Sequence, residues 1–457
     1  MTVRSPHTRR VIAHQRSLGS AASQSALSWL NFLIALMQTA FGAFLAVHLA
    51  AYGWSRTAVG VALAVGSTAS MLAQVPGGMA VDAAPSKRVA AAVAVGAVMA
   101  GAMLIALTPS PVPVYFAQVL QGAGGAVLAP AVAAITLALS RQTRLGERLG
   151  SNVRFAAIGS ALAAGLMGGV GAVLSHAAMF WMAAACAPLA LVAIFSIRPA
   201  DLRWARHRGT HKGGWYPRQR KGRQDSLRQV ALDGRLWRFA ACMALFTLGN
   251  AALLPTAAGA LARAEAELAP FLLSDLWSAL PSVQVRGAEL IVAAWVLLPQ
   301  LLAAAVSPWM GRLAQVQGRR TVLLLGFLAL PLRALVFAYD GHDGVAMLAQ
   351  TLDGVSAAAV GVMVPLVVAD LTSGHGRFNF AMGVVGLVVG LAGAASTVLA
   401  GMIGDSWGET ATFLALGVAG VAAVATVLVG LPETRPRPVA HPFRLRVGTA
   451  THSPVAD

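Results

Sequence analysis

The sequence predicts an all-α membrane protein that crosses the bilayer twelve times, as two halves of six transmembrane helices each. First, 57% of the 457 residues are hydrophobic and only 11% are charged, whereas soluble domains carry roughly 25% charged residues. Second, the apolar residues form blocks long enough to cross a bilayer, which takes about 20 residues in a helix. Third, the basic residues between the blocks are distributed as an even number of crossings requires.

The first half follows a basic tail, residues 1–26, that we expect to be cytoplasmic. Its first apolar block is too long for the core of a cleaved signal peptide, so we expect it to remain as a helix. The apolar blocks between 27 and 197 give the first six predicted spans, which are 27–52, 57–81, 89–108, 114–139, 150–174 and 177–197.

A polar, basic linker, 198–235, separates this half from the second half, 236–431. The second half contains an additional outer loop, 262–288, whose sequence PFLLSDLWSALPSV predicts a short interfacial helix. A tail, 432–457, is expected to be cytoplasmic. The predicted spans of this half are 236–260, 289–311, 321–339, 345–371, 379–403 and 410–431.

The basic residues orient this arrangement. With both termini inside, and with Arg154 and Arg238 at helix starts counted with their loops, 30 of the 34 Lys and Arg residues fall in the tails and inner loops, as the positive-inside rule requires. Three lie outside and one, Arg333, lies within a span. The net charge of +17 is therefore explained by orientation, and we expect no nucleic-acid partner; the linker can also contact anionic lipid headgroups.

The two halves contain a sequence repeat. Residues 117–126, AQVLQGAGGA, align with residues 349–358, AQTLDGVSAA, at an offset of 232 that places Gln121 opposite Asp353. The basic pair Lys87-Arg88 aligns with Arg319-Arg320 at the same offset. Parallel halves related by an axis along the membrane normal are a known plan of transporters.

Several classes of site are not indicated by the sequence. No Gly-x-x-x-x-Gly-Lys-[Ser/Thr] loop, HExxH motif or Gly-x-Ser-x-Gly elbow occurs, so we expect neither ATP hydrolysis nor another enzymatic activity. The two cysteines, Cys186 and Cys242, lie in apolar blocks, where they read as small core residues rather than a disulfide or metal site. We expect no cofactor and no metal.

Two loops, each after the second span of its half, carry a recognisable pattern: GGMAVDAAPSKR at 77–88 and GRLAQVQGRR at 311–320. Together with twelve spans in two repeated halves, they resemble the signature loops of the major facilitator superfamily. In that family a Gly is followed four residues later by Asp, and then by Arg, Gly and paired basic residues. The matching residues here are Gly78, Asp82, Lys87 and Arg88 in the first loop, and Gly311, Gly318, Arg319 and Arg320 in the second.

The loops also depart from the family pattern, because Ala83, Pro85 and Ser86 replace expected residues and Gln315 stands where the second acid would be. Independently of the family, Gly78 would allow two helices to approach closely. Asp82, at a helix end, could accept hydrogen bonds from the N-terminus of a neighbouring helix. We therefore expect these loops to latch the two halves in one conformation; the alternative is a solvated turn.

Among members of the family, the chain looks most similar to bacterial twelve-helix drug/proton antiporters, with two departures. In their fourth span an Arg usually precedes a Gly by four residues, and here Gln118 precedes Gly122 at that spacing. Their fifth span usually carries Gly-Pro-x-x-Gly-Gly, and residues 164–169 lack the Pro.

Asp353 is the one charged residue within residues 345–369. A carboxylate inside the membrane is costly and usually faces the protein interior, and desolvation favours its neutral, protonated form. Asp353 could therefore couple proton movement to a conformational change or contact a substrate. It could instead form a structural ion pair with Arg333, or remain a neutral acid held by hydrogen bonds.

Isolated amides in the spans indicate a polar cavity between the halves, although such amides can also hydrogen-bond between helices. In the superfamily, spans one, four, seven and ten line the central cavity. The resemblance therefore implies cavity roles for Gln38, Gln121, Asn250 and Asp353; we add Gln118 and Gln350 as candidates on spans four and ten.

These observations predict a secondary transporter in which two halves rock around a central site. We expect proton-coupled efflux of a small organic solute by a monomer in the bacterial inner membrane, with the lipid bilayer, the solute and protons as partners. One alternative is an importer or facilitator of a polar metabolite. Another is a membrane sensor or scaffold that kept the fold without transport.

Overall fold

Long apolar helices make up nearly all of the chain that the computed structural model describes, which is residues 20–202, 227–257, 287–339, 343–373 and 376–434, apart from residue 42. Within these ranges the chain forms no β-strand. Most of both tails, most of the linker and the outer-loop segment predicted as an interfacial helix lie outside the described residues.

The helices of the first half begin where small polar residues can cap them. The hydroxyls of Ser20, Ser55 and Ser175 each accept a hydrogen bond from the backbone N–H three residues later, which satisfies an otherwise unpaired donor. The helices are α2 (Ala21–Gln38), the 3₁₀ turn η1 (Thr39–Phe41), α3 (Ala43–Ala51), α4 (Arg56–Ala83), α5 (Lys87–Leu107), α6 (Pro111–Leu139), the 3₁₀ turn η2 (Gln142–Arg144), α7 (Leu145–Val173) and α8 (His176–Ser196).

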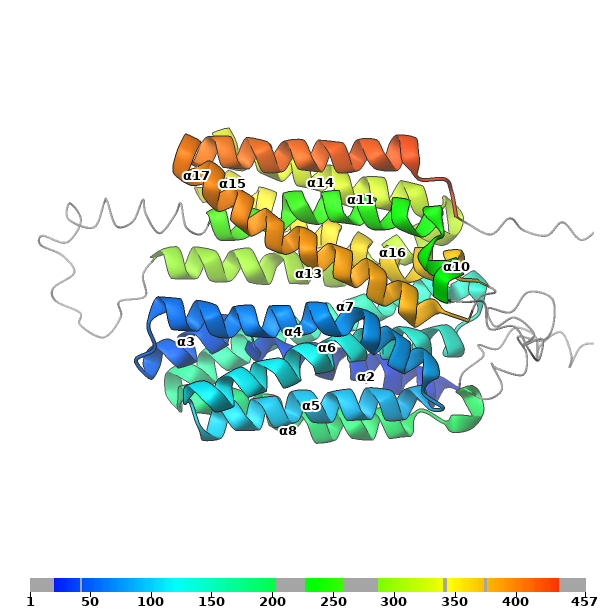
Figure 1. Ribbon diagram of the computed structural model, residues 1–457, viewed down its shortest axis with the longest axis horizontal. Coiled ribbons are helices and arrows are strands. Elements are labelled where there is room, and N and C mark those ends of the chain that lie inside the picture. Colours follow the sequence, from blue (N-terminus) through cyan, green and yellow to red (C-terminus); the bar gives the residue numbers. More distant parts are fainter. Residues whose placement is uncertain are drawn as a thin grey trace, which may run out of the picture.

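The second half is also built of apolar helices, and it contains one long, bent element. Element α17 consists of two helices that meet at Gly408, which adopts a φ of 83°, a left-handed conformation that glycine tolerates, and the chain reverses within α17 (Figure 1). The elements are α10 (Leu227–Ala231), α11 (Gly234–Asn250), α13 (Gly287–Val316), α14 (Arg319–Tyr339), α15 (Asp343–Thr351), α16 (Asp353–Leu371) and α17 (Phe378–Gly430).

The helices confirm the predicted fold class. Nine helical segments within the described residues are long and apolar enough to cross a membrane. With α7 and α13 added, and with α17 counted as two helices on either side of Gly408, the elements correspond to the twelve predicted spans.

Each half has its own hydrophobic core. One cluster of buried residues runs from Leu27 to Ile197, within the first half. The other comprises residues of the second half, together with four residues at the adjoining ends of α6 and α7. Figure 1 shows the first half, in blue to blue-green, lying beside the second half, in green to red. Two separate cores allow the halves to behave as two bodies.

The halves meet most closely where glycines remove side chains from the interface. A β-carbon built on Gly78 of α4 would lie 2.2 Å from the carbonyl oxygen of Asn379 in α17, and one built on Gly311 of α13 would lie 2.1 Å from that of Gly146 in α7. We call this end of the bundle, marked by Asp82, Asn379, Gly146 and Gly311, the latch end; the sequence predicts that it is cytoplasmic.

Contact between α4 and α17 does not continue to the other end of the bundle, the outer end. The series of close approaches ends at Met71 and Gly390, because Gly393 faces α11 instead. Gly60 lies 18 residues before Gly78, which is five turns and therefore the same helix face, yet a β-carbon on Gly60 would meet nothing within 4 Å. Figure 1 shows α17 crossing α4 obliquely and leaving it. The halves are therefore joined at the latch end and diverge towards the outer end along this pair of helices.

Candidate functional site

Three of the predicted cavity residues lie at interruptions of helices. Gln38 is the last residue of α2, before the 3₁₀ turn η1, and Asn250 is the last residue of α11. Asp353 is the first residue of α16, immediately after the break at Leu352. Helix ends leave backbone groups without helical partners, and membrane proteins tolerate this where the chain is buried in protein or lines a cavity.

Arg333 of α14 brings three predicted site residues together. Its Nη1 donates to Asp353 Oδ1 at 2.5 Å and to Asn250 Oδ1 at 2.7 Å, and its Nη2 donates to Gln350 Oε1 at 2.8 Å. The Arg333 side chain is 1% exposed. Asp353, Asn250 and Gln350 therefore surround one buried guanidinium, supplied by α11, α15 and α16.

The sequence predicts Arg333 only as one possible partner of Asp353. It does not predict that Arg333 lies at the centre of the site. The signal was present, because Arg333 is the one basic residue deep within a predicted span, and charged residues in spans are paired or functional. Spacing along the chain could not show that Asn250, 83 positions away, shares the same guanidinium.

The carboxylate of Asp353 is the more accessible member of its pair with the buried guanidinium. Its side chain is 27% exposed, and Oδ2 accepts no hydrogen bond from the residues that the structure describes. Asp353, Ala357 and Gly361 follow one another at four-residue spacing, which places them along one side of α16. A β-carbon on Gly361 would lie 2.9 Å from Val153 Cγ2 of α7, so α16 contacts the first half about two turns from Asp353.

Two amides of the first half lie near each other. Gln38 Nε2 is 3.4 Å from the position of a β-carbon on Gly125 of α6, and Gly125 is one helical turn from Gln121. Both Gln38 and Gln121 are half-buried, and among the described residues neither side chain forms a hydrogen bond. Their amides are therefore available to a ligand.

Gln118 occupies a different environment. It is 2% exposed, and its Nε2 donates to the carbonyl oxygen of Ala62 in α4 at 3.1 Å. A β-carbon on Gly66 would lie 2.8 Å from the same Nε2. The structure thus places Gln118 in the packing between α4 and α6, apart from Gln38 and Gln121.

At the latch end, Asp82 of the first half caps a helix of the second. Its Oδ1 accepts from Asn379 Nδ2 at 2.7 Å and from the Asn379 backbone N–H at 3.2 Å, and its Oδ2 accepts from the Phe380 backbone N–H at 2.9 Å. These donors lie in the first turn of α17, where a carboxylate is favoured by unpaired N–H groups and by the helix dipole. Gly78, one turn away, is where the two backbones touch.

The basic residues of the first loop fold back on their own half. Lys87 Nζ donates to the carbonyl oxygens of Val81, Asp82 (3.1 Å) and Ala84 (3.2 Å). Arg88 Nη1 donates to the carbonyl oxygen of Ile197 at 2.8 Å. The first loop therefore contacts the other half through the carboxylate of Asp82.

In the second loop, contact with the first half passes through Gly311 and Gln315. Gly311 lies against Gly146, and Gln315 Nε2 donates to the carbonyl oxygen of Gln142 at 3.2 Å. An amide thus takes the place that an acid occupies in the first loop.

Arg319 and Arg320 are used inside the second half. Arg319 Nε forms a buried ion pair with Asp370 Oδ2 of α16 at 2.9 Å. The backbone N–H groups of Arg319 and Arg320 donate to the carboxylate of Glu433 at 2.9 and 3.2 Å, and Gly318, with a φ of 111°, makes room for it. Asp370 and Glu433 were not among the predicted residues, although Glu433 belongs to the LPETR segment that follows the last span.

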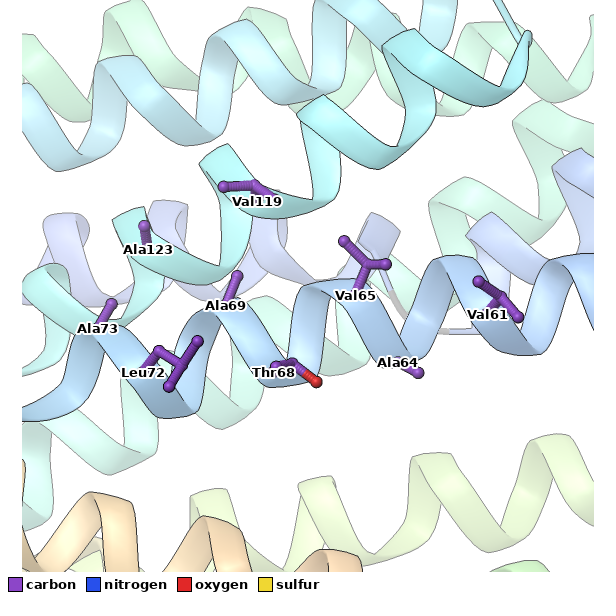
Figure 2. Close-up of a pocket in the computed structure, with 9 residues that line it drawn as sticks. All are labelled: Val61, Ala64, Val65, Thr68, Ala69, Leu72, Ala73, Val119 and Ala123. Carbon is purple, nitrogen blue, oxygen red and sulfur yellow. The ribbon is translucent and has the colours of Figure 1, made fainter.

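An apolar groove with a volume of about 660 Å³ lies elsewhere, on the first half (Figure 2). Leu72 is 72% exposed along it, and no predicted site residue contributes to it. Its lining residues come only from α4 and α6; they are Val61, Ala64, Val65, Thr68, Ala69, Leu72, Ala73, Val119 and Ala123.

In the described ranges, no three His, Cys, Asp or Glu side chains are grouped so that they could hold a metal ion. Cys186 and Cys242 are both buried, and neither forms a disulfide.

Comparison with known sequences adds a family assignment to this geometry. The sequence profile described as Major Facilitator Superfamily matches residues 27–274 and 268–454. An uncharacterized MFS-type transporter of Mycobacterium tuberculosis is 32% identical over 413 residues, which cover 90% of this chain and 93% of the relative. The class B tetracycline resistance protein of Escherichia coli is 30% identical over 115 residues, which cover 25% of this chain and 28% of that protein.

Solved structures share the fold. The human organic anion transporter MFSD10 (TETRAN) superposes with a TM-score of 0.66 at 17% identity, over 89% of this chain and 100% of that chain. The E. coli fucose:proton symporter FucP, solved in an outward conformation, superposes with a TM-score of 0.65 at 14% identity, over 90% and 99%. At such low identity these likenesses describe the arrangement of helices alone.

Proposed function

The chain belongs to the major facilitator superfamily of membrane transporters, and from that membership we propose that it exports a small organic solute in exchange for protons by alternating access. The efflux direction is supported by the partial similarity to a tetracycline resistance protein. The mechanism is supported by the two-body architecture, in which each half has a separate core. We further propose that the latch end faces the cytoplasm of a bacterium, as the distribution of basic residues predicts.

The observation that carries the proposal is the position of Asp353. It is a partly exposed carboxylate within a predicted span, about two turns from the point where α16 contacts the other half. A charge in such a place is costly and is retained mainly for function. Solute and proton would compete for this carboxylate.

The surroundings of Arg333 allow this competition. When Asp353 takes up a proton, the ion pair with Arg333 loses its charge attraction. The guanidinium would still donate to the amide oxygens of Asn250 and Gln350, so it would stay in place with most of its hydrogen bonds. A proton thus changes the charge at the solute site and leaves the charge of Arg333 uncompensated, while the two amide oxygens keep the guanidinium hydrogen-bonded and so limit the cost.

The latch end contains the contacts that would have to change during the conformational cycle. In this conformation Asp82 caps α17, and Gly146 and Gly311 are in contact, so the halves are joined there. Release of solute on one side and its uptake on the other require these contacts to separate and re-form. The capping bonds link a carboxylate to backbone N–H groups of the partner half, and they can be broken and remade without any chemical change.

The test is infrared spectroscopy of the purified protein in lipid, comparing wild type, Asp353→Asn and Asp405→Asn. Asp405 is an exposed carboxylate near the turn between the two helices of α17, so its replacement removes the same charge outside the site. We expect the protonated-carboxyl absorption that develops on acidification to contain one component that is missing from Asp353→Asn and persists in Asp405→Asn.

A spectrum in which wild type and Asp353→Asn show the same carboxyl bands at every pH would contradict proton exchange at Asp353. Asp353 would then be a permanent partner of Arg333, and the importer or facilitator alternative would become the better account.

A further inference from the structure

We infer that the transported solute is an organic cation, bound through an ammonium-type group by Asp353 and through neutral polar groups by Gln38 and Gln121. This inference rests on the proposed function, because it assigns a substrate class to the same site. The solute class follows from the charge that the site presents to a solute.

The two members of the ion pair differ in accessibility. Asp353 is 27% exposed and Arg333 is 1% exposed, so a solute meets the carboxylate first. Asp353 Oδ2 accepts nothing from the described residues and remains available to a donor. The pair is neutral as a whole, but its negative end points outwards, and this arrangement attracts a cation and repels an anion.

Arg333 is not available to an anion. Three of its hydrogen bonds are already made, to Asp353, Asn250 and Gln350. Its Nε is buried and makes no hydrogen bond among the described residues, so an incoming carboxylate would have to displace the surrounding helices to reach it. An anionic solute would therefore face Asp353 without compensation.

The equivalent positions of the first half are polar and uncharged. Gln38 and Gln121 supply amides that are free of partners among the described residues, and the repeat places Gln121 at the position equivalent to Asp353. The asymmetry between an amide on one half and a carboxylate on the other suits a solute with one positive group and one neutral hydrogen-bonding group.

The proposed exchange balances charge. One monovalent cation leaves Asp353 as one proton arrives, so the site carries the same charge in both loaded states. Transport of one cation for one proton would therefore be electroneutral.

The experiment compares three radiolabelled probes with one common scaffold: 2-phenylethylammonium, its neutral N-acetyl derivative, and 3-phenylpropanoate. Binding is measured by scintillation proximity to the full chain in lipid nanodiscs. We expect the ammonium probe to bind about tenfold more tightly than either of the others, because only it can pair with the exposed carboxylate.

Three variants locate the binding. Asp353→Asn should lose the preference for the ammonium probe, and Asp405→Asn should keep it. Gln121→Glu, which adds a second carboxylate across the site at a residue without described partners, should strengthen ammonium binding. This variant keeps the test decisive even if Asp353→Asn does not fold.

The inference is overturned if the carboxylate probe binds more tightly than the ammonium probe, if the ammonium probe does not bind at all, or if Gln121→Glu weakens binding of the ammonium probe.

A second measurement separates these results from failure of the transport proposal. The distance between spin labels at Arg144→Cys and Arg312→Cys is recorded in the same nanodiscs, after replacement of Cys186 and Cys242 by Ala. Two interconverting distances with a wrong probe preference would refute the substrate class alone. A single fixed distance under all conditions would refute alternating access.

Discussion

At the scale of single residues, the second half is built around two buried arginines on one helix. Arg319 and Arg333 both belong to α14, and each pairs with an aspartate of α16, Asp370 and Asp353 respectively. Removing one member of a buried pair leaves an uncompensated charge, which costs about 3–5 kcal/mol. Removing both members costs much less, because no charge is left behind.

The first prediction concerns the Arg333 pair. Arg333→Gln should lower the thermal unfolding temperature markedly, by an amount equivalent to about 3 kcal/mol, and the double variant Arg333→Gln/Asp353→Asn should recover part of the loss. Arg154→Gln, at an exposed arginine of α7, should change little. Additive losses in the double variant would show that Arg333 and Asp353 do not stabilise each other.

The second prediction concerns pH. Asp201 accepts hydrogen bonds from Ser23 Oγ, Ser20 Oγ and Ser20 N at 2.7–3.0 Å. Its partial burial raises the pKa, but these hydrogen bonds outweigh that effect and hold the pKa of Asp201 below its ordinary value. Its contribution to stability should therefore be complete above about pH 4, the ordinary pKa of Asp, and should be lost as the pH falls through the lowered folded-state value.

The measurement is the unfolding temperature of wild type and Asp201→Asn between about pH 3 and 7, a range that brackets the ordinary pKa of Asp. The gap between the two proteins should be constant near neutrality and should narrow on acidification. A gap that widened in acid would mean that Asp201 is protonated in the folded protein.

At the scale of elements, the contact between α4 and α17 depends on the absence of a side chain at one position. Gly78→Ala would place a methyl group against the Asn379 carbonyl oxygen, at a site where backbone would have to move. Overpacking of this kind costs about 1–3 kcal/mol. Because the strain exists only when the latch end is closed, the population should shift towards the separated state by about tenfold or more.

Gly60→Ala is the matched control, since it lies on the same face of α4 and its β-carbon would meet nothing within 4 Å. Both variants would be compared by the distance between spin labels at Arg144→Cys and Arg312→Cys, in the background without native cysteines. Identical distance distributions for the two variants would contradict a role for the Gly78 contact.

The helices themselves were largely predictable, and their interruptions were not. Apolar runs bounded by polar turns located the spans because the bilayer imposes a length and a composition on each. The breaks at Thr39 in span one and Leu352 in span ten lie inside predicted spans, and only the polar residues Gln38 and Asp353 mark them in the sequence. Neighbouring helices pack closely at the second break, where a β-carbon on Gly354 would lie 2.3 Å from the carbonyl oxygen of Pro299 in α13.

The site was predictable in composition but not in pairing. Asp353 and Asn250 stood out as polar residues in apolar surroundings, and the structure brings both to Arg333. Which amide joins which partner depends on helix rotation, as Gln118 shows by turning into the packing against α4. Likewise, family resemblance grouped Arg319 with the latch, whereas its side chain pairs with Asp370 of its own half.

At the scale of the whole molecule, the two halves are related in sequence but differ in internal bonding. At the repeat offset of 232, the positions equivalent to Arg333 and Asp370 are Gly101 and Ala138, so the first half lacks both buried pairs. Ser356 Oγ also donates to the Gly326 carbonyl oxygen at 2.7 Å, which joins α14 and α16 between the two ion pairs. The second half thus joins α14 to α16 by ion pairs that the first half does not have at the equivalent positions.

The last prediction tests whether the halves separate at the latch end. The Gln315 side chain donates to the Gln142 carbonyl oxygen at 3.2 Å. Cysteines that replace these two residues should therefore be joined by a short thiol cross-linker. Ala357→Cys, on the side of α16 shared with Asp353, should then react with an impermeant reagent from the outer side only. Without the cross-link it should react from both sides, and reactivity from both sides in the linked protein would show that the latch end does not control access.

The carboxylates that cap helix starts also bear on how the protein is made. Asp201 follows α8, the sixth helix of the first half, and returns to the start of α2; Glu433 follows α17 and returns to the start of α14. During synthesis, each capping residue leaves the ribosome only after all six helices of its half. The first half can therefore be closed by its own last residues well before the second half exists, and in each half the capped helix remains without its carboxylate until the sixth helix is complete.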